Sequence, residues 1–333
     1  MTDIPFAVPR VPVERGLPVA LLACPDYAAP RLRQAVFQTL EIAGPRVGVG
    51  LRVLVKPNLL TARPLACAAP EVTAAACAWL LEREARVEVA DSPGFGHADA
   101  VARKIGLEAA LRPLKLKVRA LDRPVPVRLP LPEAPEGRGV RFMVARRALE
   151  CDLILSVPRV KAHSQMLLTL AVKNCFGCVS GLRKALVHTC EGRDPDYFAD
   201  CLAALWAALP PVAALADGVR AMHVTGPSRG RPFALGLIGA SPSAVALDEA
   251  LCAVLGLEPG RTPLGAALER RKAEGCATAG WRAEYPLLRP EDFDARGFEL
   301  PRKLAHTSFH PARFVKSCIR RLWTFRWTAD LFF

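Results

Sequence analysis

The sequence has no apolar run of the ~18 residues that a membrane-spanning helix needs, although 51% of its 333 residues are hydrophobic. One short apolar stretch, GLPVALLAC at 16–24, loosely resembles a lipoprotein signal that ends in a cysteine. Its apolar part is short, contains Pro18 and follows Glu14, so we interpret it as the first β-strand. The sequence therefore predicts a globular protein that begins with an irregular, proline-rich arm at 1–15.

Cysteine pairs are also scarce. The eleven cysteines are odd in number and irregularly spaced, which does not match a disulfide framework and favours a reducing cytoplasm. Cys175 and Cys178 form the only Cys-x-x-Cys pair. Structural zinc and four-iron clusters normally take four protein ligands, so Cys151, Cys190 or His188 would have to complete a metal site. The alternative is that the pair packs in the core among its apolar neighbours.

Acidic residues are fewer than basic ones, with 32 Asp and Glu against 45 Lys and Arg. The formal net charge of +13 predicts anionic partners: phosphorylated small molecules or anionic lipid, and less readily nucleic acid. Residues 300–333 hold six of these thirteen charges, because they contain seven Lys or Arg and one acid. Residues 311–327 place apolar and basic positions at helical spacing. We expect a basic amphipathic helix there that docks on an anionic membrane surface, a partner protein or this chain's own body.

Strand-like and helix-like stretches alternate along most of the chain. Strands are predicted at 19–23, 51–55, 87–90, 115–120, 153–157, 212–216 and 234–239, and helices at 30–42, 70–85, 98–107, 197–208 and 242–255. Such alternation is typical of parallel strands joined by right-handed crossovers. We therefore predict an α/β fold, a mostly parallel sheet with helices on both faces, as one body over 16–258. Residues 259–333 then form a C-terminal extension.

Polar or special residues are predicted at the ends of four strands. The four segments are Lys56-Pro57-Asn58, Asp91-Ser92-Pro93-Gly94, Pro158 to His163, and Asp217-Gly218. The carboxyl ends of parallel strands lie along one edge of a sheet, and ligands of open α/β sheets bind there. The sequence therefore predicts a single site at this edge, although loops rich in Gly and Pro also serve only as turns.

Residue types assign the chemistry of this predicted site. His163, Lys161 and Asp91 are the candidate catalytic residues, because such groups can move a proton when their surroundings adjust their pKa. The candidates for binding a phosphate or carboxylate are Lys56, Asn58, Ser92, Gly94, Lys173, Asn174 and Asp217. Each residue alone also has a plain structural explanation: a solvated lysine, a structural histidine or a helix-capping carboxylate.

The order of these motifs resembles the family called domain of unknown function 362, whose members are often named uncharacterised iron–sulfur-centre proteins. The resemblance covers about 53–257 and rests on Val55 to Asn58, Ala90 to Gly94, Ser156 to His163, Val172 to Cys178, Lys184, His188, Ala216 to Gly218 and Gly226-Pro227. For many members it implies an appended ferredoxin-type cysteine cluster that holds four-iron clusters. Beyond residue 258 this sequence has only Cys276 and Cys318, so the appended cluster is absent.

Three classes of function fit these observations. The first is an enzyme that acts on a small anionic substrate at the strand-end site. The second is an accessory protein that binds a metal ion or an iron–sulfur cluster through Cys175 and Cys178. The third is a non-catalytic binding protein whose basic tail docks on lipid, nucleic acid or a partner protein, and which would be peripheral to a membrane in the first case. Each is compatible with a homo-oligomer.

Overall fold

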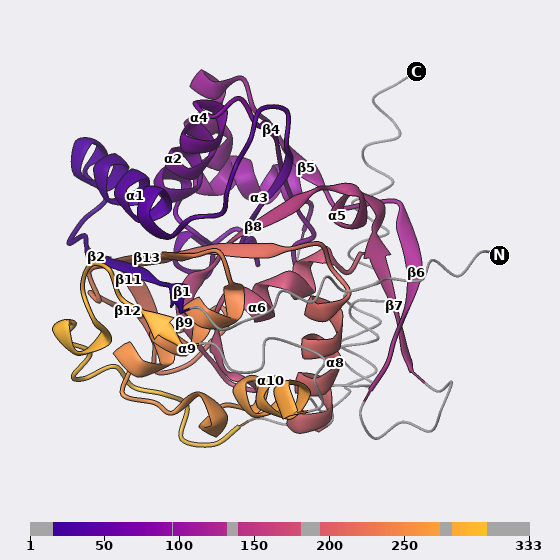
Figure 1. The fold of residues 1–333 in the computed structure, drawn as a ribbon, viewed down its shortest axis with the longest axis vertical. Coiled ribbons are helices and arrows are strands. Elements are labelled where there is room, and N and C mark those ends of the chain that lie inside the picture. The colour runs from indigo at the N-terminus through magenta and orange to yellow at the C-terminus, as the bar shows by residue number, and fades with distance from the viewer. Residues whose placement is uncertain (1–15, 95, 132–138, 181–193, 274–281, 305–333) are drawn as a thin grey trace.

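The computed structural model describes residues 16–94, 96–131, 139–180, 194–273 and 282–304. In these ranges a ten-stranded sheet lies between two groups of helices (Figure 1). This arrangement confirms the predicted α/β fold with a mostly parallel sheet and helices on both faces.

The main path of the sheet has the order β10-β9-β11-β8-β3-β4-β5. The strands are β3 Arg52–Pro57, β4 Arg86–Asp91, β5 Val118–Ala120, β8 Leu153–Val157, β9 Arg159–His163, β10 Leu167–Thr169 and β11 Val212–His223. β3 pairs in parallel with β4 and β8, β4 with β5, and β11 with β8. Antiparallel strands complete the sheet: β12 Arg231–Phe233 and β13 Leu237–Ser241 pair with β11, and β2 Ala20–Ala23 pairs with β13.

The parallel strands are buried on both faces. All five residues of β8 are buried, as are the last five of β3. Continuous apolar runs of this kind are typical of parallel strands that helices cover from both sides.

Two groups of helices supply that cover. One face carries α1 Ala29–Ala43, α2 Pro70–Leu81, α3 Ala98–Ile105 and α4 Leu107–Leu111, and the other carries α6 Ala171–Asn174, α8 Pro195–Ala207 and α9 Ala244–Val254 (Figure 1). α10 Pro263–Ala273 packs against α8. Each group of helices encloses its own apolar cluster against the sheet.

Helix boundaries follow local signals in the sequence. The Asp194 side chain accepts a hydrogen bond from Asp196 N at the start of α8, and Ser243 Oγ accepts one from Ala246 N at the start of α9. The helix predicted at 98–107 is two helices, because Gly106, with φ 88°, ends α3. Glycine adopts this left-handed conformation without the steric cost that other residues meet.

Two predicted strand ends lie inside strands. The chain continues as β9 directly after Pro158, so Lys161 and His163 belong to a strand rather than to a loop. Proline removes only one N–H donor from the ladder, and pairing resumes beyond it. β11 continues past the predicted 212–216, because β9 and β13 both pair with its later part, and Asp217 therefore lies mid-strand. The strand predicted at 234–239 is found as β13, which begins later, at Leu237, and continues to Ser241.

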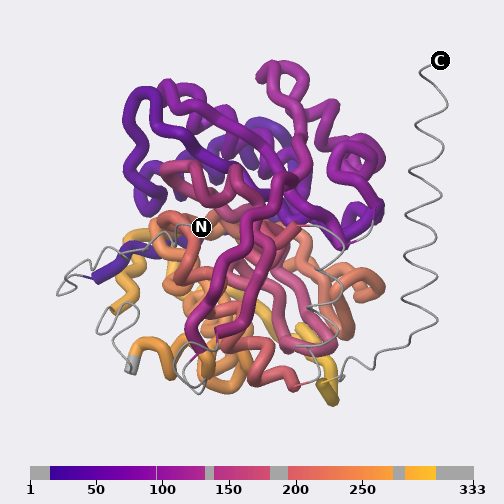
Figure 2. The backbone as a smooth tube through the Cα atoms, turned by 90° about the vertical axis from the view of Figure 1, so that its right-hand side faces the viewer, coloured from indigo at the N-terminus to yellow at the C-terminus, as the bar shows by residue number. Residues whose placement is uncertain are grey.

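Smaller elements border the sheet. β6 Pro124–Leu129 and β7 Val140–Ala145 form an antiparallel hairpin across the side seen in Figure 2. β1 Leu17–Pro18 pairs with β14 Ala283–Glu284, so residues beyond 258 contact the body. No helix within the described ranges is both long enough and apolar enough to span a membrane. The arm at 1–15 and the helix predicted at 311–327 lie outside the described residues, and the domain boundary at 258 stays a prediction.

Candidate functional site

A buried ion pair joins the carboxyl ends of β3 and β4. Lys56 Nζ lies 2.7 Å from Asp91 Oδ1, and the two side chains are 1% and 2% exposed. Ser92 N donates to Asp91 Oδ1 at 2.8 Å, and Leu59 N donates to Oδ2 at 2.7 Å. These donors compensate the carboxylate for the water that it loses on burial.

Asn174, at the end of α6, connects this pair to its neighbours. Its Oδ1 accepts hydrogen bonds from Lys56 Nζ at 3.0 Å and from Asn58 Nδ2 at 3.1 Å. Its Nδ2 donates to Lys56 O and to Ser156 Oγ, each at 3.0 Å. All four hydrogen-bonding positions of the amide are therefore used, and α6 is fixed against β3 and β8.

Lys161 lies at the other end of this network. Its Nζ donates to Asn58 Oδ1 at 2.6 Å and to Ala66 O at 2.7 Å, and its side chain is 1% exposed. Burial lowers the pKa of Lys161 to about 7, and the nearby charges of Lys173 and Arg159 act in the same direction. Lys161 therefore exchanges a proton near neutral pH, which an exposed lysine does not.

The geometry around Lys161 matches an uncharged amine. A neutral amine has two N–H donors and one lone pair, whereas an ammonium has three donors. In the described part of the chain, Lys161 Nζ has two acceptors, one for each donor of the neutral form. The lone pair then stays available to accept a proton or to attack an electrophile.

A second buried ion pair lies beside the first. Arg159 Nη2 is 3.0 Å from Asp217 Oδ2, with the side chains 4% and 0% exposed. Tyr27 OH donates to Asp217 Oδ1 at 2.9 Å and accepts from Arg159 Nη1 at 2.8 Å. Burial, followed by the charge of Asp217, raises the pKa of the Tyr27 phenol, so Tyr27 stays protonated at neutral pH.

One loop covers both pairs. We call residues 58–69, which contain the 3-10 helix η1 Pro64–Ala66, the cover segment. Two of its backbone N–H groups donate to the carboxylates: Leu59 N to Asp91 and Ala69 N to Asp217. Two of its carbonyl oxygens accept from the cations: Ala66 O from Lys161 and Cys67 O from Arg159. The four predicted polar segments thus supply residues that contact one another or this loop, and they form a buried network rather than an open cleft.

His163 and Lys173 lie near this network in different ways. His163 is 4% exposed, and its Nδ1 accepts hydrogen bonds from Gln165 N at 3.1 Å and Met166 N at 3.2 Å. It therefore holds the turn between β9 and β10. Lys173, on α6, contributes its positive charge to the lowered pKa of Lys161. Their predicted roles in catalysis and binding stay predictions.

Ser92 and Gly94 contribute through the backbone. Ser92 offers its N–H to Asp91, as described above. Gly94 packs against the cover segment, where an added Cβ would come within 2.9 Å of Leu60 Cδ1. The loop after β4 is thereby fitted closely to the cover segment.

Cys175 and Cys178 are buried on the 3-10 helix η3 Cys175–Cys178. Cys175 Sγ donates to Ala171 O at 3.5 Å, and burial raises the pKa of its thiol well above the usual range. In the absence of a metal, Cys175 therefore stays a protonated thiol at neutral pH. Among the described residues, no group of three or more His, Cys, Asp or Glu is placed to hold a metal ion. These residues alone do not fit an iron–sulfur cluster, and the further candidates His188 and Cys190 lie outside the described ranges.

Asp248 positions α6 and with it Asn174. Its carboxylate accepts hydrogen bonds from Ala171 N at 2.7 Å and Val172 N at 2.9 Å. Burial raises the pKa of Asp248 to about 7, against the opposing effect of the two backbone donors. The first turn of α6 is therefore held by a side chain from α9, 77 residues away from Ala171.

The family comparison matches most of the sheet and the residues above. The family described as Domain of unknown function (DUF362) matches residues 53–253. The chain belongs to this family. A thylakoid-associated protein from Synechocystis sp. is 32% identical over 321 residues, which cover 92% of this chain and 94% of that protein.

Two solved structures resemble this DUF362 chain more distantly. A Thermotoga maritima protein has a TM-score of 0.41 and 11% identity over 66% of this chain and 56% of its own. The lactate racemase apoprotein from Thermoanaerobacterium thermosaccharolyticum has a TM-score of 0.44 and 11% identity over 71% of this chain and 56% of its own. This chain thus spans about half the length of each.

Sequence reasoning missed several residues of the network. Arg159 lies within a family motif, two residues before Lys161 on β9. Because every second residue of a strand points to the same face, this spacing could have indicated that Arg159 belongs to the same site as Lys161. Tyr27 and Asp248 carried no such signal. Tyr27 is 190 residues from its hydrogen-bond partner Asp217, and Asp248 is 77 residues from its partner Ala171.

Proposed function

We propose that this DUF362 protein is an enzyme that acts on a small substrate bearing a phosphate or carboxylate, with Lys161 as the reacting amine. The observation that carries the proposal is the buried Lys161, with a pKa of about 7 and two acceptors for its N–H groups. In this role Lys161 removes a proton from the substrate or adds to its carbonyl carbon.

The charges around Lys161 support an anionic substrate. Lys173 and Arg159 are close enough to lower its pKa, and their positive charges favour a bound anion in the same space. Lys173 is also among the residues that the sequence predicts to bind an anion, and we assign it to the phosphate or carboxylate group.

Access to Lys161 requires the cover segment to move. The amine is 1% exposed, so no substrate can touch it while the cover segment holds its hydrogen bonds to Lys161, Arg159 and Asp217. Movement of such a loop is a common way to admit a substrate and then exclude water. The residues of the segment that are exposed, Ala62, Arg63 and Pro64, lie at its tip.

A phosphate-bearing aldehyde tests this proposal directly. We expect glycolaldehyde phosphate with cyanoborohydride, at pH 7, to label Lys161 faster than the exposed Lys104. About half of Lys161 is neutral at that pH, and its neutral fraction exceeds that of an exposed lysine about a thousandfold. Peptide mapping by mass spectrometry measures the two rates.

Two controls accompany this experiment. Glycolaldehyde without the phosphate should label Lys161 more slowly, while its rate at Lys104 stays unchanged. Replacement Lys173→Gln should slow labelling of Lys161 by the phosphate reagent. Labelling confined to exposed lysines would show that the cover segment does not admit an anion, and the proposal would then fail.

We also propose that the tail associates with an anionic membrane surface. The related protein from Synechocystis sp. is named as thylakoid-associated and aligns over nearly its whole length. In this chain, residues 311–327 combine basic positions with the apolar residues Phe314, Val315, Cys318, Ile319, Leu322, Trp323 and Trp327. Each basic residue near acidic lipid adds about 1 kcal/mol to binding.

Vesicle sedimentation tests whether the tail binds an anionic membrane surface. The full chain is expected to sediment with phosphatidylserine vesicles at low salt, and a variant that ends at Pro311 is expected to remain in the supernatant. High salt should release the full chain, because it screens exposed charges. If neither protein binds the vesicles and the shortened one aggregates without them, the tail packs on the body instead.

A further inference from the structure

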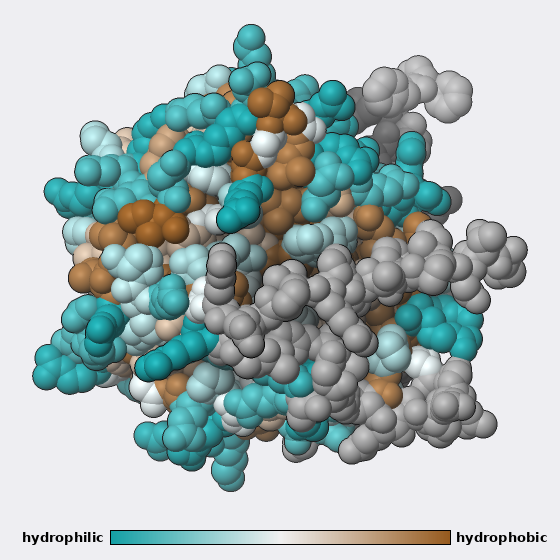
Figure 3. Space-filling model, viewed as in Figure 1, coloured by the Kyte–Doolittle hydropathy of each residue, from teal (hydrophilic) through white to brown (hydrophobic). Residues whose placement is uncertain are grey.

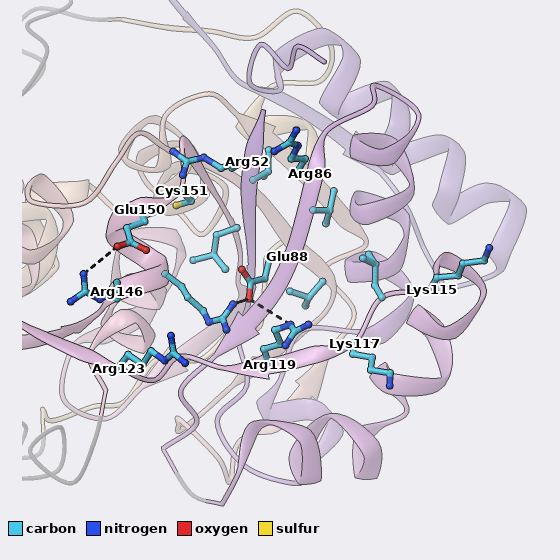
Figure 4. Close-up of a pocket in the computed structure, with 16 residues that line it drawn as sticks. Arg52, Arg86, Glu88, Lys115, Lys117, Arg119, Arg123, Arg146, Glu150 and Cys151 are labelled. Carbon is cyan, nitrogen blue, oxygen red and sulfur yellow. Dashed lines mark hydrogen bonds and ion pairs between the residues drawn. The ribbon is translucent and has the colours of Figure 1, made fainter. Parts of the chain in front are cut away.

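A basic groove lies on the sheet away from the Lys161 site (Figure 4). Its cavity volume is about 890 Å³, and residues of β3, β4, β5 and α5 Arg146–Glu150 line it together with the segment before β5. On β3 the lining runs from Arg52 to Leu54, and Lys56, two residues further along, does not line the groove because it is buried in the pair with Asp91. The groove is therefore a site of its own, next to the Lys161 network.

The groove has a large excess of positive charge. Eight Lys or Arg and two Glu line it. Glu88, in the middle of Figure 4, pairs with Arg147 and lies 3.8 Å from Arg119, while Glu150 pairs with Arg146 at 3.3 Å. Figure 3 shows hydrophilic residues gathered over α5, beside a hydrophobic strip over β4 and β5. The two glutamates thus neutralise only a minority of the cations.

Four of the eight cations make no ion pair with any residue in the described ranges. They are Arg86, Lys115, Lys117 and Arg123. Like charges held together without partners repel one another, and a bound anion relieves that repulsion. An unbalanced groove of this kind is the electrostatic footprint of an anion site.

Two of these four cationic residues also have a positive backbone φ angle, which is unfavourable for residues other than glycine. Lys115 has φ 56° and Arg123 has φ 50°, in the left-handed region where glycine is favoured over other residues. Backbone strain in non-glycine residues concentrates at ligand-binding positions. Lys115 also ends the 3-10 helix η2 Arg112–Leu114, where its N–H donates to Arg112 O, so its conformation has a local role as well.

The lining selects among anionic ligands. Among the described residues, no aromatic side chain lines the groove, so this part of the chain offers no platform on which a nucleobase can stack. The aliphatic residues of the lining are buried or only partly exposed: Val53, Leu54, Val87, Val89 and Leu116. A concave, cationic site without an aromatic platform fits the phosphate groups of a small molecule.

We propose that this groove binds a small soluble molecule that carries several phosphate groups. Arg123 and Arg146 lie on one side of the groove and Lys115 and Lys117 on the other (Figure 4). The Lys115 side chain points outward in the free protein, and it turns inward when the cations of the two sides bind separate phosphates of the same ligand. A single phosphate reaches only part of this arrangement. The groove therefore prefers polyphosphate to monophosphate.

Calorimetric titration of the full chain with tripolyphosphate tests the proposal. We expect saturable binding at 50 mM KCl, with a dissociation constant below about 0.1 mM, that weakens at 300 mM KCl because salt screens the contacts. Inorganic monophosphate should bind at least about tenfold more weakly. Absence of tripolyphosphate binding would overturn the proposal.

Matched variants locate the binding. Lys115→Gly/Arg123→Gly should weaken tripolyphosphate binding at least about tenfold, yet leave the melting temperature equal or higher, because glycine relieves the left-handed backbone. Arg86→Gln/Lys117→Gln should weaken binding similarly without any change in backbone preference. The control Lys104→Gln/Arg231→Gln removes the same charge from exposed positions outside the groove and should change affinity less than about twofold.

Two results would contradict the assignment. If the control weakens binding as much as the groove variants do, the anion responds to overall charge and not to this groove. If the protein binds vesicles that contain phosphatidylinositol bisphosphate through the groove cations and tripolyphosphate does not compete, the ligand is a lipid headgroup at a surface and not a soluble molecule.

Discussion

Replacement of Asp91 by asparagine is expected to lower the free energy of unfolding by about 3–5 kcal/mol. Lys56 and Asp91 are 2.7 Å apart and almost fully buried. Asparagine keeps the shape of the side chain but leaves the Lys56 ammonium without its counter-charge, or forces that amine to release its proton. Urea denaturation at pH 7 measures the loss.

An exposed pair provides the control for Asp91→Asn. Glu82 lies 2.5 Å from Arg33, and both side chains are about half exposed, at 52% and 51%. Glu82→Gln should therefore cost no more than about 1 kcal/mol. The double variant Lys56→Met/Asp91→Asn should regain part of the loss, because it removes the unpaired charge. Equal costs for Asp91→Asn and Glu82→Gln would show that the buried pair does not carry the stability assigned to it.

The second large effect is expected from Gly177→Ala. An added Cβ at Gly177 would lie 2.3 Å from both Asp91 Oδ1 and Lys56 Nζ. The ion pair must then open or the 3-10 helix η3 must move. We expect a loss of about 3 kcal/mol in the free energy of unfolding, between the cost of overpacking a core and that of breaking a buried pair.

Gly48→Ala is the matched control for Gly177→Ala. An added Cβ at Gly48 meets nothing within 4 Å, so the substitution should change stability by less than about 0.5 kcal/mol. If Gly177→Ala is equally mild, the contact between η3 and the ion pair is loose. If it is as costly as expected, the glycine in the Cys175-Phe176-Gly177-Cys178 motif has a packing role that requires no metal.

The alternation of strands and helices could be predicted because it depends on local patterns. Buried runs such as Leu153–Val157 and the proline at the start of Pro70–Leu81 act over a few residues. Boundaries were less predictable. The continuation of β11 beyond Asp217 depends on pairing with Leu237–Ser241 and β9, and partners distant in sequence leave no local signal.

The candidate site was predicted as a set of residues but not as a network. The sequence placed polar groups after several strands, and the structure brings Lys56, Asn58, Asp91, Lys161 and Asn174 into hydrogen-bond contact. The sequence did not indicate that these groups are buried under the cover segment. Burial of that kind depends on where residues 58–69 fold back.

The sequence by itself determined the fold class, the family and the identity of the polar residues, because periodicity and motif order are properties of the chain. Only the tertiary structure decided which charges are paired. It joins Lys56 to Asp91, joins Arg159 to Asp217, and leaves Lys161 with two neutral acceptors. The pKa of Lys161, about 7, follows from desolvation and from nearby charges. Both fall off over a few ångströms of space and bear no relation to separation along the sequence.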